Sequence, residues 1–234
     1  MSKQLTRAHW NMQSQEGRWA PKREAIEDTI DALSRGRTPF VFSFNEAGGR
    51  LRELQRLADR RDLHLFVPAG PGGGAVPILT SAKPRHAGYR VLLPRTPGVT
   101  SKDKGVSWVR MDGGWVEATT HMPAHPDTSK GAERVKIRAA YARQMNGLVG
   151  WYDNRRPAAP VRIVGDLNTI PSSPLVKPLR AAGLTQVVDD PTFHRRILDH
   201  GWVNDNVIVL DTRVIPMPGK DHRLVVIHGR RCAR

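Results

Sequence analysis

Apolar residues at helical spacing predict three helices. The first spans residues 21–33 and ends before Gly36, the second begins near residue 51, and the third runs over residues 131–152. In each segment the apolar residues recur three or four positions apart, so they lie on one face of a helix. The predicted faces are Ile26, Ile30 and Leu33; Leu51, Leu54, Leu57 and Ala58; and Val135, Ala139, Ala142, Met145, Val149 and Tyr152.

Short runs of β-branched, aromatic and aliphatic residues predict the strands. Residues 40–44 are the clearest example, and the stretch Asp112-Gly113-Gly114 between two later runs is typical of a hairpin turn. A further short helix, broken near Pro178, is expected over residues 174–182. The expected strands cover residues 5–12, 40–44, 63–67, 91–93, 106–110, 115–120, 161–164, 202–210 and 224–227.

The order of these elements predicts an α/β fold. Strands alternate with helices in the first half of the chain and come in pairs later. No repeat with a period between about 20 and 50 residues is present, and a length of 234 residues fits one domain. We therefore expect a single domain over residues 1–234, with two β-sheets packed face to face and helices on their outer faces.

Residues 68–77 form a loop that contains three consecutive glycines, Gly72-Gly73-Gly74. The loop lacks the Gly-Lys-Ser/Thr ending of a phosphate-binding loop, and it leads into the apolar run 76–79 rather than into a helix. We expect a flexible connection here and not a nucleotide-binding motif.

Composition and charge narrow the class of protein. With 39% hydrophobic residues and 21 glycines, the chain has the make-up of a globular protein, which excludes wholesale disorder. Its 37 Lys and Arg against 22 Asp and Glu give a net charge of +15. Such a charge attracts polyanions, nucleic acid first and an acidic membrane surface second. The basic residues are spread along the chain and not packed into one tail, so biased codon usage in the genome is an alternative explanation of the high arginine content.

The number of cysteines and the hydropathy along the chain indicate the cellular compartment in which the protein is expected. Cys232 is the only cysteine, so the chain forms no internal disulfide and no thiolate metal site. The first residues carry no apolar run of the kind found in signal peptides, and no stretch approaches the ~18 apolar residues of a membrane span. We expect a cytoplasmic protein without a transmembrane segment, acting as a monomer.

Polar residues stand at the ends of the predicted strands. Strand ends on one rim of a sandwich lie close together, so residues far apart in sequence can gather there. Carboxylate and carboxamide oxygens of this kind suit a hard cation such as Mg²⁺ or Mn²⁺. The residues are Asn11, Glu46, His121, Asp166, Asn168, Asp199 with His200, and Asp221 with His222.

Each of these signals is weak alone. The sequence Gly-Asp-x-Asn at 165–168 is most often a turn. His121 and His125 have the spacing of a zinc pair, but Pro123 between them disfavours the helix that such a pair needs. The tryptophans, Trp202 included, are expected mainly in the core. Five histidines without polar context are expected at the surface or in packing: His9, His64, His86, His194 and His228.

Taken together and in order, these stretches resemble the endonuclease/exonuclease/phosphatase superfamily, which includes deoxyribonuclease I and exonuclease III. The resemblance covers nearly the whole chain, and Gly-Asp-x-Asn followed by a late Asp-His is its strongest part. The sequence departs from the family pattern at some positions; for example, Asn45 precedes Glu46 where many relatives have Gln. Such departures bear on which substrate is cleaved more than on the chemistry. The matching stretches are Trp10-Asn11-Met12-Gln13, Phe44-Asn45-Glu46, Thr120-His121-Met122-Pro123, Gly165-Asp166-Leu167-Asn168, Ile197-Leu198-Asp199-His200 and Lys220-Asp221-His222-Arg223.

The resemblance implies a four-layer α/β sandwich of the deoxyribonuclease I type that cleaves phosphate esters with Mg²⁺ or Mn²⁺. It also implies a role for each matching residue. Glu46 would be the principal metal ligand, with Asn11 nearby and Asp221 helping the site. Asp166 would position or deprotonate the attacking water or protonate the leaving oxygen, Asn168 would hold a phosphate oxygen, His222 oriented by Asp199 would contact the phosphate, and His121 would assist the leaving group.

The sequence therefore predicts a metal-dependent phosphodiesterase acting on nucleic acid, an endonuclease or exonuclease, with DNA favoured over RNA as its partner. One alternative keeps the chemistry but acts on inositol phosphates or phospholipid. Another is an inactive nucleic-acid-binding module on the same scaffold. Carboxylates facing an anionic ligand argue against this last alternative, because they would repel the ligand without a metal.

Overall fold

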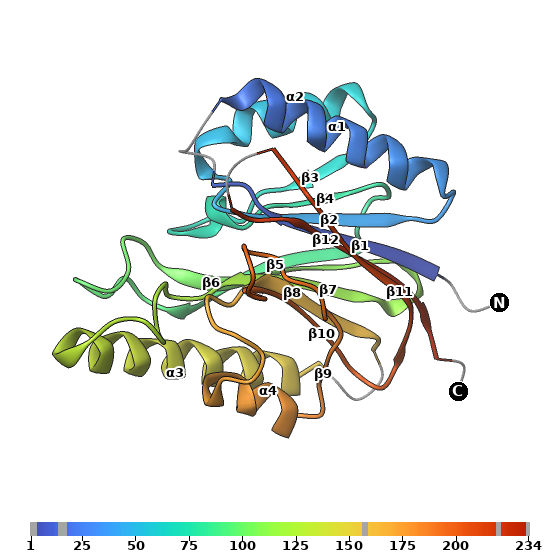
Figure 1. The fold of residues 1–234 in the computed structure, drawn as a ribbon. Coiled ribbons are helices and arrows are strands. Elements are labelled where there is room, and N and C mark those ends of the chain that lie inside the picture. Colours follow the sequence, from blue (N-terminus) through green and yellow to red (C-terminus); the bar gives the residue numbers. More distant parts are fainter. Residues whose placement is uncertain (1–3, 14–17, 156–158, 219–220, 233–234) are drawn as a thin grey trace.

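Two six-stranded β-sheets face each other in the computed structural model, and helices cover the outer face of each sheet (Figure 1). The structure describes residues 4–13, 18–155, 159–218 and 221–232. Lys220 and the first three residues, on which parts of the sequence analysis rest, lie outside this range. The four layers confirm the α/β sandwich predicted from the sequence.

The first sheet has the strand order β11-β12-β1-β2-β4-β3, and helices α1 and α2 lie on its outer face (Figure 1). The bounds are β1 Gln4–Asn11, α1 Trp19–Arg35, β2 Phe40–Asn45, α2 Leu51–Arg60, β3 His64–Phe66, β4 Ile78–Thr80, β11 Val207–Ile215 and β12 Leu224–Arg231.

The second sheet has the order β5-β6-β7-β8-β10-β9, with α3 and α4 on its outer face (Figure 1). The bounds are β5 His86–Leu93, β6 Lys104–Arg110, β7 Val116–His121, α3 Gly131–Asp153, β8 Val161–Asp166, α4 Lys177–Ala181, β9 Thr185–Gln186 and β10 Asp199–Val203. Among the described helices, none is both long enough and apolar enough to cross a membrane.

Each sheet contains one parallel pair of strands at its centre, connected through a helix. In the first sheet β1 and β2 pair in parallel, with Asn11 opposite Asn45. In the second sheet β7 and β8 pair in parallel, with His121 opposite Asp166. Parallel strands end on the same edge of a sheet. This topology therefore brings the polar residues at the ends of four strands to two facing edges.

Strand β2 shows why the sequences of the central strands are continuous apolar runs without alternating polar residues. Phe40, Phe42 and Phe44 pack with residues of α1 and α2 on the outer face. The alternate residue Val41 packs between the sheets, with Trp115 among its neighbours. Successive side chains of a strand point to opposite faces, and both faces of this strand are buried, so no polar alternation is visible.

A fully buried group of charged residues joins the two sheets. Arg162 on β8 donates from Nε to Glu117 Oε1 at 2.8 Å and from Nη1 to the carbonyl of Leu5 on β1 at 2.9 Å. Arg7 on β1 donates to Ser43 Oγ at 2.7 Å and lies 3.9 Å from Glu117 Oε2. Buried charges are tolerated in such places only when they are paired and hydrogen-bonded.

The structure corrects the face predicted for helix α3. Val135, which was placed on the apolar face, has 69% of its surface exposed. Met145 and Tyr152 are buried as expected, but Tyr141 and Trp151 form the centre of the buried face. The large side chains decide which face packs against the sheet, because they bury the most apolar area. The predicted stripe instead started from Val135, in the exposed N-terminal part of the helix.

The strand predicted over residues 202–210 is wrong. Strand β10 ends at Val203, and β11 begins at Val207 in the other sheet. Asn204 makes the break, since its carboxamide accepts from the Val161 amide at 3.0 Å and donates to the Ala159 carbonyl at 2.9 Å. Hydrophobicity alone does not reveal a change of sheet; the Asn-Asp-Asn stretch at 204–206 was the available turn signal.

Candidate active site

Asp166 lies at the C-terminal end of β8 and is 1% exposed. Its Oδ2 accepts a hydrogen bond from Asn11 Nδ2 at 2.9 Å, and its Oδ1 accepts from the Asn168 amide at 2.8 Å. Its own backbone amide donates to Asn45 Oδ1 at 2.9 Å. Asn11 at the end of β1 and the turn after β8 thus fix the carboxylate, and Asn45 at the end of β2 fixes the backbone that carries it.

Asn168 stands in the turn that follows β8, as the sequence analysis allowed. Its φ of 53° is left-handed, a conformation that asparagine tolerates better than most residues, and its Nδ2 donates to the Met122 carbonyl at 3.1 Å. Gly165 lies in β8 just before this turn, and a Cβ there would come within 2.0 Å of the Thr120 carbonyl oxygen. Glycine is therefore required for the backbones of β7 and β8 to lie this close beside the site.

His222 and Asp199 form a buried pair beside Asp166. Asp199 Oδ2 lies 2.7 Å from His222 Nδ1, and His222 Nε2 lies 3.9 Å from Asp166 Oδ2. The backbone of His222 is anchored by Trp10, whose indole Nε1 donates to its carbonyl at 3.2 Å. Thr192 Oγ1 accepts from the Asp199 amide at 2.8 Å. Strand β1 and the loop before β10 therefore set the orientation of the imidazole.

The electrostatics of these three groups separate their protonation states. Burial disfavours the imidazolium of His222, but Asp199, Asp166 and Glu46 outweigh it and raise the pKa of His222 to about 9. Burial opposes the ionised form of Asp199, but the charge and hydrogen bond of His222 bring the pKa of Asp199 below its usual range. Burial, together with the charge of Asp199, raises the pKa of Asp166 to about 7. Opposite shifts of this kind are typical of catalytic sites.

Glu46 faces Asp166 across the gap between the two sheets and is the more exposed carboxylate, with 40% of its side chain accessible. Asn11 Nδ2 donates to Glu46 Oε1 at 3.1 Å as well as to Asp166. His121 Nε2 lies 3.7 Å from Glu46 Oε1 and 3.8 Å from Asp166 Oδ2. Ligand atoms of Glu46, His121 and Asp166 lie within 4.8 Å of one another.

This donor set fits a divalent cation. Two carboxylates converge, and the amide of Asn11 is the hydrogen-bond donor that they share. A hard cation that binds through oxygen would neutralise them. Asn11 turns its nitrogen toward the carboxylates, while its oxygen accepts from the Gln13 amide at 3.2 Å. In this structure Asn11 therefore orients the two carboxylates, and its role as a ligand stays a prediction.

Lys104, at the start of β6, is a site residue that the sequence analysis did not identify. Its Nζ lies 3.2 Å from His121 Nδ1. Burial lowers the pKa of Lys104 to about 8, opposed by the charges of Asp166 and Glu46, so the amine is mostly protonated at neutral pH. An ammonium only donates, so Nδ1 of His121 is the acceptor. Burial and the charge of Lys104 lower the pKa of His121, which leaves a neutral imidazole with its proton on Nε2, facing the carboxylates.

His9 is a second residue that the sequence analysis missed. It was expected at the surface or in packing, yet it is fully buried, with Nδ1 2.8 Å from Ser43 Oγ and Nε2 3.6 Å from Asp199 Oδ1. Alternation along β1 places His9 on the same face as Asn11, and alternation along β2 does the same for Ser43 and Asn45. A row of polar residues on buried strands was therefore the signal that could have found them.

Asp221 and His200 are not brought into the centre of the site. The Asp221 carboxylate lies 3.1 Å from His194 Nε2, and neither residue belongs to the groups of potential metal ligands found among the described residues. The metal role of Asp221 stays a prediction. His200 is buried against Trp202 and lies 2.7 Å from the Thr169 carbonyl, so it packs the loop behind the site.

Five of the predicted site residues line one cavity of about 360 Å³: Glu46, His121, Asp166, Asn168 and His222. Two further cavities share walls with it. One, of about 300 Å³, shares Glu46, Ser101, Lys104 and His121. The other, of about 650 Å³, shares Asp127 and Arg196 and is also lined by Arg195. The two neighbouring cavities thus place Lys102 and Lys104, and Arg195 and Arg196, next to the cavity that contains Asp166.

Comparison with known proteins finds similarity in structure but not in sequence families. No protein-family model and no curated protein match the chain. The catalytic domain of human Nocturnin with a bound sulfate anion is similar with a TM-score of 0.73 and 19% identity, over 98% of this chain and 94% of that one. A mannosyl-6-phosphatase from Bacteroides thetaiotaomicron gives 0.70 and 14%, over 96% and 99%. D. rerio TDP2 with a single-strand DNA product gives 0.68 and 12%, over 97% and 98%.

Other similar structures are endonuclease/exonuclease/phosphatase family proteins. At these identities the similarity shows the fold. The chain therefore has the fold of the endonuclease/exonuclease/phosphatase structures, which confirms the predicted deoxyribonuclease I-like sandwich.

Proposed function

We propose that this protein is a divalent-metal-dependent phosphodiesterase that hydrolyses nucleic acid, with DNA as the favoured substrate. The observation that carries the proposal is the convergence of Glu46, Asp166 and His222 on one cavity, with the buried Asp199 hydrogen-bonded to His222 behind its wall. Metal-binding carboxylates and a cationic imidazole are the groups that phosphate-ester hydrolysis needs at one place.

Glu46, with Asp166 and Asn11 beside it, would hold Mg²⁺ or Mn²⁺. When bound, the cation supplies charge neutralisation on the phosphate and lowers the pKa of water. Asp166, held by the Asn11 amide and the Asn168 backbone amide, accepts the proton of the attacking water. The water oxygen forms a bond to phosphorus as the bond to the leaving oxygen breaks.

The remaining residues stabilise charge as it develops. The His222 imidazolium, oriented by Asp199, contacts a non-bridging phosphate oxygen, and Asn168 contacts another. The neutral His121 donates from Nε2–H to the leaving oxygen, which takes its final proton from solvent. These fixed donors need no reorganisation during the reaction, which is why their positioning by strand ends contributes to the rate.

A polymeric substrate is supported by charge and shape. The chain carries a net charge of +15. The cavity that contains Asp166 shares walls with two others, one lined by Lys102 and Lys104 and one lined by Arg195 and Arg196. A strand with one negative charge per nucleotide would meet these cations where it extends from the central cavity into its neighbours. The similar TDP2 structure has a single-strand DNA product bound.

A phosphomonoester substrate is the second candidate, because a mannosyl-6-phosphatase has the same fold. Phosphate monoesters such as sugar phosphates or inositol phosphates would use the same central cavity and leave the flanking ones empty. Comparing p-nitrophenyl phosphate, bis-p-nitrophenyl phosphate and oligonucleotides at equal metal concentration separates the two. A preference for the monoester in kcat/KM would replace the nuclease proposal.

The direct test is nicking of supercoiled plasmid and cleavage of end-labelled single-stranded and duplex DNA and RNA in Mg²⁺ or Mn²⁺. We expect cleavage that EDTA abolishes and that Asp166→Ala and His222→Ala each reduce by at least about 100-fold. Lys136→Met, on the exposed outer turn of α3, is the matched control and keeps full activity. Cleavage that survives both site variants would show that the site is misassigned. Salt-sensitive DNA binding without turnover in either metal would show a binding module instead.

A further inference from the structure

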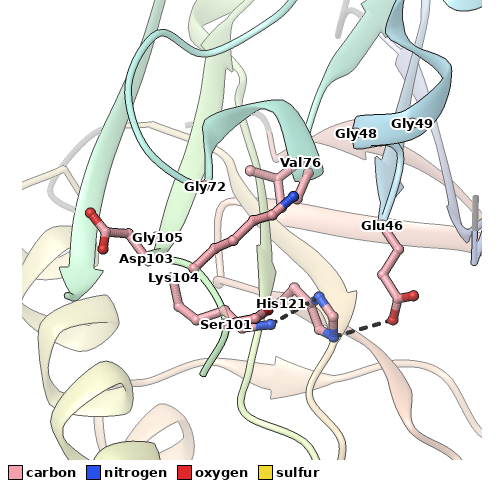
Figure 2. A pocket seen from close by; sticks show the side chains of 12 residues that line it. Glu46, Gly48, Gly49, Gly72, Val76, Ser101, Asp103, Lys104, Gly105 and His121 are labelled. Carbon is pink, nitrogen blue, oxygen red and sulfur yellow. Dashed lines mark hydrogen bonds and ion pairs between the residues drawn. The ribbon is translucent and has the colours of Figure 1, made fainter. Parts of the chain in front are cut away.

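The cavity of about 300 Å³ beside the catalytic cavity has its own walls, apart from the four residues that the two share. We call it the glycine pocket, because Gly48, Gly49, Gly72 and Gly105 are in its lining. Lys104 and Glu46 approach His121 from opposite sides at the boundary between the two cavities (Figure 2). A substrate bound at the boundary would therefore reach into both.

Two lysines provide the positive charge of the glycine pocket. Among the contacts of the described residues, the Lys104 ammonium makes one hydrogen bond, to His121 Nδ1, and an ammonium carries three donors. A Cβ built on Gly48 would lie 3.9 Å from the Lys102 Nζ, so the second ammonium lies over this glycine. Both cations thus keep hydrogen-bonding capacity toward the pocket.

The other lining groups neither neutralise these lysines fully nor favour an apolar ligand. Asp103 directs Oδ1 to the Arg95 backbone amide, which donates to it at 2.7 Å. Glu46 is shared with Asn11 and the candidate metal site. Val76 is the largest apolar side chain of the lining. Burying an anion here would pair two cations, whereas burying an acyl chain or an aromatic ring would find little apolar surface.

We propose that the glycine pocket binds a second phosphate group of the substrate, next to the one that is hydrolysed, with Lys102 and Lys104 as its cations. This inference rests on the proposed function and deepens it, since it selects substrates that carry consecutive phosphates over isolated monoesters. The three-glycine loop was expected to be a flexible connection without nucleotide-binding character. It forms part of the wall through Gly72, whose φ of 79° is left-handed, but it supplies no cation.

The test measures binding without turnover. A fluorescein-labelled single-stranded DNA is displaced by three competitors: the dinucleotide TpT, the same dinucleotide with a 5′-phosphate, and the same dinucleotide with a 3′-phosphate. Ca²⁺ replaces Mg²⁺ so that the carboxylates are neutralised, and gel electrophoresis checks that the labelled strand stays intact. We expect at least one phosphorylated competitor to bind about tenfold more tightly than TpT, as one charge-assisted contact provides. Lys102→Met reduces this gain to twofold or less and leaves the affinity for TpT unchanged.

Two further variants keep the inference falsifiable. Gly48→Leu fills the exposed wall of the pocket without changing charge and also removes the gain, whereas Lys136→Met lowers the net charge by the same amount as Lys102→Met and retains it. Equal affinities of wild type for all three competitors, or a gain that persists in both Lys102→Met and Gly48→Leu, would overturn the inference. A phosphate gain in a protein that hydrolyses nothing would instead overturn the proposed function and leave the subsite standing.

Discussion

Asp199 Oδ2 lies 2.7 Å from His222 Nδ1, and both side chains are buried. This pairing determines which imidazole nitrogen of His222 faces Asp199 and which faces the cavity. A carboxylate only accepts, so Nδ1 carries a proton, and the imidazolium that Asp199 stabilises presents Nε2–H toward Asp166 and the phosphate. His222 is therefore a fixed cation over the working pH range, and its loss of a proton should end activity.

The first prediction concerns pH. The folded-state pKa of His222 is raised to about 9, above the ordinary value near ~6.5, so kcat/KM should fall as the pH rises through about 9. Asp199→Asn removes the main cause and should move this falling limb down by more than one pH unit. The stabilisation of the fold by the imidazolium has the same sign: it is complete below pH ~6.5 and lost as the pH rises through about 9.

The measurement is a pH–rate profile of both proteins, together with the imidazole proton shifts of His222 by NMR. The NMR titration identifies the residue responsible for the fall in kcat/KM at high pH. If a residue other than His222 caused this fall, its midpoint would differ from the midpoint of the His222 resonance. A limb at the same pH in wild type and Asp199→Asn would contradict the prediction.

The second prediction concerns Lys104. Because its ammonium lies 3.2 Å from His121 Nδ1, wild-type His121 should be the Nε2–H tautomer in ¹⁵N NMR spectra. Lys104→Met should give a mixture of tautomers, while Lys104→Arg should keep the Nε2–H form. Loss of a charge-assisted hydrogen bond of about 1.5–3 kcal/mol corresponds to a decrease in kcat of roughly 10–160-fold for Lys104→Met, with partial rescue by arginine. An Nδ1–H tautomer in the wild-type spectrum would refute the assignment.

How far the sequence predicts this site depends on the kind of residue. Asp166, His222 and Glu46 were predicted because they stand at strand ends, each a weak signal alone, and because the ordered set of stretches resembles a known superfamily. The structure brings these three residues close together. His9 and Lys104 were not found. A histidine inside a buried strand resembles any packing residue, and a lysine at the start of a strand resembles a solvated one. Their roles depend on which strands become neighbours.

The fold, too, could be predicted only in part from the sequence. The helices and the Phe40–Asn45 strand follow from periodicity and length. Periodicity and length do not predict that the chain passes from one sheet to the other between Val203 and Val207. Both segments are apolar, and the partners of each strand lie far away in sequence. The buried face of α3 was misplaced for a related reason, since packing against the sheet selects the large side chains and not the longest regular stripe.

The third prediction concerns stability. Glu117 is the fully buried counter-charge of Arg162 and Arg7, at 2.8 Å and 3.9 Å. Glu117→Gln leaves both guanidinium groups without a carboxylate in the interior, so the free energy of unfolding should fall by about 3–5 kcal/mol. Urea denaturation followed by circular dichroism measures this difference. Glu133→Gln in the exposed first turn of α3 is the control, with a change within about 0.5 kcal/mol.

The last prediction separates metal binding from folding. Glu46 and Asp166 share the amide of Asn11, and the exposed Glu46 contributes repulsion rather than packing in the metal-free protein. Glu46→Gln should therefore leave the melting temperature of the EDTA-treated protein unchanged or slightly higher. In Mn²⁺ at about 100 times its dissociation constant, wild type should gain roughly 2.7 kcal/mol, whereas Glu46→Gln should gain little. Differential scanning calorimetry of both proteins, with and without Mn²⁺, measures the four values. A manganese-dependent shift that is equal in the two proteins would place the cation elsewhere, because only a ligand that contacts the ion can lose the shift without losing the fold.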